Sequence, residues 1–192
     1  MILAFGHQSR VGKNLAAEVA VRVLKENGIQ ATVLPIARVL KDYTEALFGH
    51  LGVLSADYYE RVPAARDLIL PDLNKTVVDL WIEVGQAMRN VHEDIWIEQA
   101  LIQVRDLLAH KIVPVISDLR FDNEGRLLRE AGAWIYRIDR PGQKVRGSDT
   151  QLDADFPWTG VISNDGSKQA FEMKVEIEVL KFAKEVRRAR GS

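Results

Sequence analysis

The chain has 192 residues, of which 47% are hydrophobic, so it is long enough to bury one core and we predict a single domain over residues 1–192. Lys and Arg number 26 and Asp and Glu number 27, a balance that disfavours a polymeric nucleic-acid partner. The absence of cysteine excludes disulfides, thiolate metal sites and thiol nucleophiles. No apolar run has the length of a signal-peptide core or a membrane span, so we expect a cytoplasmic protein without a membrane partner.

Residues 6–14, with the sequence GHQSRVGKN, lie between an apolar run and an amphipathic stretch. A strand that ends in a glycine-containing turn and continues as a helix directs backbone N–H groups and the positive end of the helix dipole at one place, where an anion can bind. We therefore predict a phosphate-binding loop for a nucleoside triphosphate, with Lys13 adding a full positive charge. Its residues are Gly6, Ser9, Arg10, Val11, Gly12, Lys13 and Asn14.

This segment departs from the usual pattern G-x-x-x-x-G-K-[ST] at two positions. His7 stands where the pattern has glycine, with Gly6 one residue early, and Asn14 stands where it has Ser or Thr. The hydroxyl at that last position normally contacts Mg²⁺, and the amide oxygen of Asn14 is a possible replacement. The alternative is an ordinary strand–helix turn in a nucleotide-free domain, with Lys13 in solvent.

The rest of the chain alternates strands and helices, which predicts a mostly parallel five-stranded sheet with helices on both faces. Apolar spacing predicts helices from the loop to 27, over 71–110 with a break at 90–93, over 123–131 and over 171–186. Further strands are predicted at 31–36, 112–117, 134–138 and 161–163. Residues 51–71 and 140–160 do not fit this alternation. The second of them carries Arg140, Lys144 and Arg146, which we interpret as the cations of a mobile lid.

Asp118 follows the buried strand over 112–117, and Arg120 follows in the same turn. An aspartate at such a position holds Mg²⁺ or its water in P-loop enzymes. A single aspartate at the end of a strand is as often only a helix cap.

The sequence DLRFDNE of residues 118–124 resembles the D-[VL]-R-F-x-N-E segment of the phage deoxynucleoside monophosphate kinase family. Other family segments have counterparts in the same order. Residues 36–41 resemble F-A-x-x-L-K, which in the family is a second-strand segment. The remaining counterparts are Gly85 to Arg89 followed by Trp96-Ile97, the R-P-G of residues 140–142 and the N-D-G of residues 164–166.

The resemblance implies an α/β fold, a P-loop kinase-like three-layer sandwich with a helical acceptor-binding region at about 40–110 and a lid at about 140–160. It implies a phosphotransferase that uses ATP and Mg²⁺ to phosphorylate a deoxynucleoside monophosphate, such as a modified pyrimidine nucleotide, and that is a monomer or homodimer. The roles it implies are catalytic for Lys13, Asp118, Arg120 and Arg140; metal-binding for Asn14 and Asp118; ATP-binding for Asn164 and Gly166 beside the loop; and acceptor-binding for Arg38, Lys41, Arg89, Trp96 and Arg120.

Each of these residues has a simpler interpretation. Arg89 can be an ordinary surface cation at the end of a helix. Arg120 can form an ion pair with Glu124, one helical turn away, and Trp96 has the spacing of a residue that packs in the core. Two functional alternatives remain as well. One is a kinase for a different small acceptor, and the other is a nucleotide-binding module that has lost turnover and acts through a partner, with His7 and Asn14 marking the loss.

Overall fold

The computed structural model describes residues 1–8, 10–142, 152 and 155–191. The chain forms two compact units, which we call the sheet unit (Met1–Pro35 with Leu101–Ser192) and the helical unit (Ile36–Ala100). None of the helices in the described part of the chain is long and apolar enough to cross a membrane.

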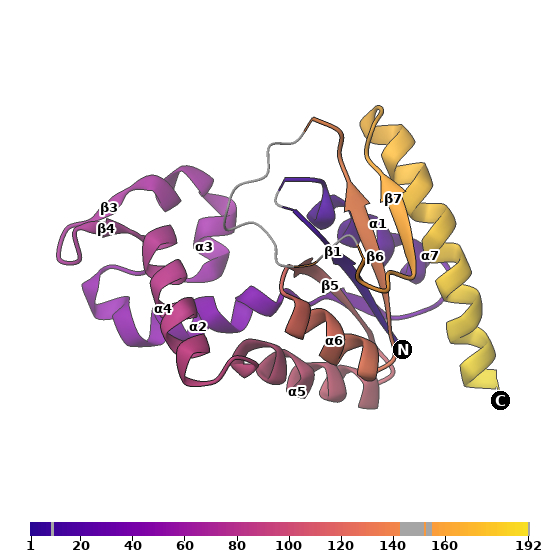
Figure 1. The fold of residues 1–192 in the computed structure, drawn as a ribbon, viewed down its shortest axis with the longest axis horizontal. Coiled ribbons are helices and arrows are strands. Elements are labelled where there is room, and N and C mark those ends of the chain that lie inside the picture. The colour runs from indigo at the N-terminus through magenta and orange to yellow at the C-terminus, as the bar shows by residue number, and fades with distance from the viewer. Residues whose placement is uncertain (9, 143–151, 153–154, 192) are drawn as a thin grey trace. The chain divides into compact units, whose positions relative to one another are not determined.

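The sheet unit contains five strands that all run parallel (Figure 1). Their order across the sheet is β2 (Ala31–Val33), β5 (Val113–Leu119), β1 (Ile2–Gly6), β6 (Ala133–Asp139) and β7 (Gly160–Ser163). The predicted five-stranded parallel sheet is confirmed. Because parallel strands end at the same edge of the sheet, the loops after β1, β5 and β6 start side by side.

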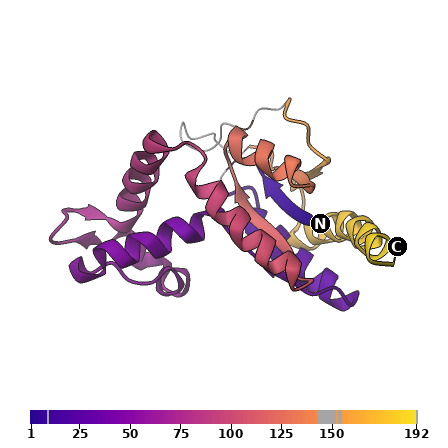
Figure 2. The ribbon, with the colours of Figure 1, turned by 90° about the horizontal axis from the view of Figure 1, so that it is seen from below.

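Helices cover both faces of this sheet. Leu3 and Phe5 of β1 share a core cluster with α1 (Lys13–Glu26) and α7 (Lys168–Gly191). Ile2 and Ala4 are also fully buried but point to the opposite face, because side chains alternate along a strand. On that face α6 (Asp122–Glu130) packs against β6, as the views in Figures 1 and 2 also show.

The helical unit packs its helices around a smaller apolar core that includes Tyr59, Leu80 and Trp81. A capping box starts its longest helix: Thr76 Oγ1 accepts a hydrogen bond from the Asp79 N–H, and the Asp79 carboxylate accepts one from the Thr76 N–H, each 3.1 Å long. The elements are α2 (Ile36–Phe48), η1 (Gly49–Leu51), α3 (Ala56–Arg61), η2 (Pro63–Asp67), β3 (Ile69–Leu70), β4 (Lys75–Thr76), α4 (Val77–Val91) and the start of α5 (Ile95–Ala109).

Two predicted elements differ from the structure. Residues 36–41, which the resemblance placed with the second strand, form the first turns of α2. The strand β2 ends earlier, at Val33. Pro35 has no N–H with which to extend the strand pairing, but a proline just before a helix costs no helical hydrogen bond. The helix predicted from residue 71 starts only at Val77, after the β3–β4 hairpin. The predicted break at 90–93 is confirmed by the gap between α4 and α5.

Candidate phosphate-binding site

The loop between β1 and α1 is built from unusual backbone conformations. His7, Arg10 and Gly12 have φ values of 99°, 61° and 111°, a region that residues with side chains rarely adopt. A Cβ atom on Gly12 would lie 2.8 Å from Asn164 Nδ2, so this position needs glycine both for its φ and for space. Left-handed conformations of this kind turn peptide N–H groups toward a common point and form anion-binding concavities.

Lys13 is the first residue of α1, and it is folded over this loop with only 6% of its surface exposed. Its Nζ donates hydrogen bonds to the carbonyl oxygen of His7 at 2.8 Å and to that of Gln8. Neutral carbonyls orient the ammonium group without cancelling its charge. The burial excludes the alternative in which Lys13 is simply solvated.

Asn164 fixes the loop from the other side. Its Nδ2 donates to the Val11 carbonyl at 2.8 Å, and its backbone N–H donates to the Asp139 carbonyl at 2.6 Å. The segment after β7 is therefore attached to the loop between β1 and α1. In the same segment Gly166 is exposed, and a hydrogen bond from Lys174 holds the pKa of the Asp165 carboxyl below its usual value.

His7 anchors the loop to the end of β6, a role that the sequence did not reveal. His7 Nδ1 lies 3.1 Å from Asp139 Oδ1, Arg137 Nε donates to the same oxygen at 2.6 Å, and the His7 ring meets Trp158 edge-on. Burial and then the Arg137 charge lower the pKa of His7 below its ordinary 6.5, against the opposing effect of Asp139. A neutral His7 that donates its Nδ1–H to Asp139 satisfies this geometry.

Asp118 and Arg120 lie where β5 ends beside β1. Gly6 pairs with Leu119 in the sheet, so Asp118 lies next to the start of the phosphate-binding loop. Asp118 and Arg120 are both half-buried. Glu124 accepts hydrogen bonds from the backbone N–H groups of Arg120 and Phe121, each 3.2 Å long. This buried carboxylate fixes the turn that carries Arg120.

The predicted magnesium ligands are one amide and one carboxylate. Asn14 is exposed in the first turn of α1, and Asp118 is at the end of β5. Among the described residues, no group of three or more His, Cys, Asp or Glu could hold a metal ion. The two residues suit Mg²⁺, which uses few protein ligands and takes its remaining ligands from phosphate oxygens and water.

Part of the predicted site lies outside the described residues. Ser9 of the loop and the lid cations Lys144 and Arg146 are among these positions. Arg140 is described, and it is exposed directly after β6.

Two of the predicted acceptor-binding cations of the helical unit, Arg38 and Lys41, are held in ion pairs. Arg38 Nε donates to Asp42 at 2.8 Å and Arg38 Nη1 to Asp57 at 2.5 Å, which holds the pKa of the Asp57 carboxyl below its usual value. Lys41 Nζ lies 2.9 Å from Glu60 and 4.9 Å from the centre of the Trp81 ring.

Arg89 and Trp96 belong to the packing of α4. Arg89 is half-buried near the end of that helix. Trp96 is 4% exposed and donates its indole N–H to the Gly85 carbonyl at 3.2 Å. A ring so deeply buried offers almost no surface on which a base can stack.

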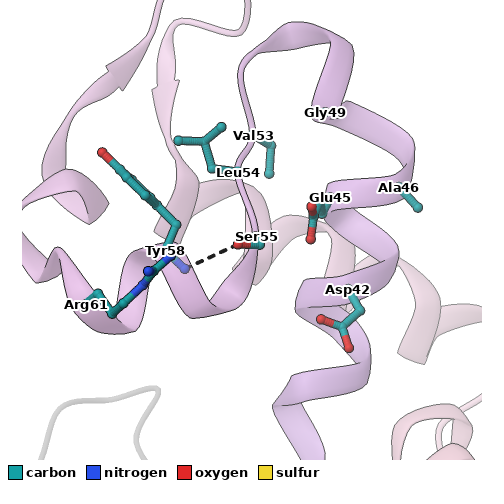
Figure 3. Close-up of a pocket in the computed structure, with 9 residues that line it drawn as sticks. All are labelled: Asp42, Glu45, Ala46, Gly49, Val53, Leu54, Ser55, Tyr58 and Arg61. Carbon is teal, nitrogen blue, oxygen red and sulfur yellow. Dashed lines mark hydrogen bonds between the residues drawn. The ribbon is translucent and has the colours of Figure 1, made fainter.

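The helical unit also contains a pocket of about 690 Å³ between α2 and α3. Figure 3 shows Asp42 and Glu45 on α2 on one side of it and Tyr58 and Arg61 on α3 on the other, with the Tyr58 N–H donating to Ser55 Oγ at 3.3 Å.

A search of solved structures finds a Mycobacterium tuberculosis APS kinase in complex with AMPPNP and APS, which matches with a TM-score of 0.52. The match covers 94% of this chain and 97% of that one at 16% sequence identity. The chain has the fold of a P-loop kinase. The α/β fold class expected from the sequence is thus confirmed, with the P-loop between β1 and α1.

Part of the chain is also similar in sequence to a curated protein. Over 94 residues the chain is 40% identical to an Acanthamoeba polyphaga mimivirus protein named "Putative deoxynucleotide monophosphate kinase". The match covers 46% of this chain and 48% of the relative, so the chain spans about half the length of the curated protein that it matches. No family model matches the chain. The sequence resemblance to deoxynucleoside monophosphate kinases is confirmed by this relative.

Proposed function

We propose that the chain transfers the γ-phosphoryl group of ATP to a deoxynucleoside monophosphate. The observation that carries this proposal is the loop after β1, where buried Lys13 is oriented by the carbonyls of His7 and Gln8 at the amino end of α1. The name of the mimivirus relative supports the acceptor class, and the AMPPNP in the APS kinase complex supports a triphosphate donor.

On the donor side, the loop N–H groups and the α1 dipole hold the triphosphate, and Lys13 exchanges its carbonyl partners for phosphate oxygens. Asn164 keeps the loop in the binding conformation through its bond to Val11. Asn14 and Asp118 are the residues that would hold Mg²⁺, which when bound supplies positive charge to the phosphates.

On the acceptor side, the proposal assigns phosphate binding to arginines. Arg120 holds the acceptor phosphate from the sheet unit, and Arg140 reaches the transferring group. Guanidinium groups suit both tasks because they stay charged and form bidentate contacts. No general base is needed, since the attacking oxygen belongs to an acceptor phosphate that is already anionic at neutral pH.

In the helical unit, we assign acceptor binding to Arg38, Lys41 and Arg89. Arg38 and Lys41 must exchange their carboxylate partners for phosphate oxygens when the acceptor binds. Trp96 contributes by packing: its bond to the Gly85 carbonyl stabilises the part of α4 that carries Arg89.

The test is ADP release from Mg-ATP with each deoxynucleoside monophosphate in turn, including uracil nucleotides substituted at position 5. Ribonucleotides and ATP alone serve as comparisons, and a Lys13→Ala protein purified in the same way controls for contaminating kinases. We expect turnover with one or a few deoxynucleotides. ATP binding without acceptor-dependent ADP release would contradict the proposal and favour a nucleotide-binding module that has lost turnover.

A further inference from the structure

The phosphate-binding loop has glycines at residues 6 and 12, whereas the usual pattern has its first glycine where this chain has His7. Trp158 explains the glycine at residue 6. A Cβ atom there would lie 2.9 Å from Cζ3 of the Trp158 ring, so glycine lets this ring pack closely over the end of β1. Residue 7 is a different case, because its φ of 99° would suit glycine and is strained for histidine. A strained residue of this kind persists only where its surroundings hold it in place.

Asp139, at the end of β6, holds His7 in this conformation. Asp139 Oδ1 lies 3.1 Å from His7 Nδ1, and the Ile138 carbonyl oxygen lies 3.4 Å from the same nitrogen. Both neighbours are acceptors, so Nδ1 carries a proton and donates it. Arg137 Nε donates to the same Oδ1 at 2.6 Å and compensates the charge of the carboxylate. The His7 side chain is therefore fixed to the strand that lies next to β1.

The backbone of His7 extends this anchor to Lys13. The His7 carbonyl oxygen accepts a hydrogen bond of 2.8 Å from Lys13 Nζ. Because the ring and the carbonyl belong to one residue, the contact with Asp139 fixes the direction of that carbonyl and thereby the position of Lys13 Nζ before phosphates bind. A glycine at residue 7 would adopt the same φ without strain, but it would have no side chain to link the loop to β6.

Asp139 also reaches the other end of the loop, through its backbone. Its carbonyl oxygen accepts a hydrogen bond of 2.6 Å from the Asn164 N–H, and Asn164 Nδ2 donates to the Val11 carbonyl at 2.8 Å. One residue of β6 is thus connected to the loop at His7 and, through Asn164, at Val11. A loop that is already held at two points loses less conformational freedom when its ligand binds, which favours affinity.

We propose that His7 and Asp139 are a pair of positioning residues that replaces the first glycine of the usual pattern and sets the affinity for the nucleoside triphosphate. The pair acts through Lys13 and the loop backbone rather than on the reacting atoms. This inference rests on the proposed function for the donor, but not on the identity of the acceptor. The alternative, in which His7 marks a loop that has lost its function, predicts the opposite effect when glycine is restored.

The deciding experiment restores that glycine. Mg-ATP is titrated calorimetrically into the wild type and His7→Gly without acceptor, at a temperature at which circular dichroism shows both proteins to be folded. We expect the Kd of His7→Gly to be about five- to twentyfold higher, even though the substitution relieves backbone strain. A role in stability alone would change the melting temperature and leave Kd unchanged. An equal or lower Kd for His7→Gly would overturn the proposal.

His7→Asn tests whether the donor at Nδ1 carries the effect. Asparagine tolerates a positive φ, and its Nδ2 can replace His7 Nδ1 as the donor to Asp139. With this hydrogen bond kept, we expect a Kd within about twofold of the wild-type value. Binding as weak as that of His7→Gly would show that the hydrogen bond does not set the affinity, and would overturn the pair.

Asp139→Ala removes the other half of the pair and keeps the backbone bond to Asn164. If the two residues act through their contact, Asp139→Ala should weaken binding about as much as His7→Gly, and the double variant should bind no more weakly than either. Asp106→Ala and His110→Ala are the matched controls, because these residues form an exposed Asp–His pair at 3.6 Å near the end of α5. Additive losses, or tighter binding by Asp139→Ala through the loss of a negative charge, would contradict the proposal.

The same titrations separate this proposal from the proposed function. A wild type that does not bind Mg-ATP would overturn both. Mg-ATP binding without acceptor-dependent ADP release would contradict the kinase activity alone, and the Kd of His7→Gly would still decide the role of the pair.

Discussion

The two units of the molecule hold their cations in different ways. In the sheet unit the backbone carbonyls of His7 and Gln8, which carry no net charge, accept hydrogen bonds from the Lys13 ammonium group and orient it. In the helical unit Arg38 and Lys41 are bound by the carboxylates of Asp57 and Glu60, which neutralise them. Backbone groups therefore orient the cation of the sheet unit, whereas Arg38 and Lys41 of the helical unit are oriented by carboxylates, which they must exchange before they bind another anion.

Gly12→Ala should have the largest effect, because it disturbs the backbone conformation of the loop between β1 and α1, on which the sheet-unit site depends. A side chain at φ 111° is strained, and the new Cβ would meet Asn164 Nδ2 at 2.8 Å. We expect a loss of about 1–3 kcal/mol in the free energy of unfolding, measured by urea denaturation. Gly28→Ala, at φ 75° after α1 but with open space around it, is the matched control for strain alone. Equal losses in the two variants would show that the contact between Gly12 and Asn164 contributes nothing.

Arg120→Ala tests whether the sheet unit also depends on a side chain. If Arg120 holds phosphate in the transition state, kcat/KM should fall by more than about tenfold, which corresponds to about 1.4 kcal/mol. Arg126→Ala on the exposed side of α6 is the control and should change little. A kcat/KM for Arg120→Ala close to that of the wild type would assign Arg120 a purely structural role.

Asp57→Asn tests whether the ion pair in the helical unit limits the availability of Arg38. The substitution removes a carboxylate from Arg38 and should leave that cation more available, so we expect KM for the acceptor to fall by about two- to fivefold with kcat unchanged. Asp72→Asn, in the exposed turn between β3 and β4, is the control. A higher KM in Asp57→Asn would mean that the ion pair positions Arg38 for binding.

The smallest effect concerns pH and His7. The pKa of His7 is below its ordinary 6.5 in the fold, so below that pH the unfolded chain takes up a proton that the folded chain resists. Stability should therefore fall as pH drops through 6.5, and the fall should be smaller in His7→Gln. Melting temperatures between pH 8 and pH 5 measure this difference, with the exposed His50→Gln as control. A wild type that gains stability over His7→Gln on acidification would show that Asp139 dominates instead.

The sheet unit was largely predictable from sequence, because its strands are continuous apolar runs and its phosphate-binding loop depends on local order. The His7–Asp139 contact was not, since it joins residues 132 positions apart in the chain and only the strand register brings them together. The sequence held one indication of this contact. Arg137 and Asp139 are two residues apart in the strand before R-P-G, so their side chains lie on the same face of the sheet.

The helical unit was predicted less well. The family resemblance placed residues 36–41 with the second strand, yet Ile36 and Val39 are buried at helical spacing in α2. Its ion pairs, such as Arg38 with Asp57, depend on how α2 and α3 pack and leave no pattern in the sequence.

The measurement that tests the backbone-built site most directly is calorimetric titration of Mg-ATP into the wild type, Lys13→Ala and Lys25→Ala. Lys25 is an exposed lysine near the end of the same helix, so it controls for the loss of one charge on α1. The account predicts that Lys13→Ala loses most of the binding while its circular dichroism spectrum stays that of the folded protein, and that Lys25→Ala binds like the wild type. Equal binding by all three proteins would contradict the assignment of residues 6–14 as a phosphate-binding loop.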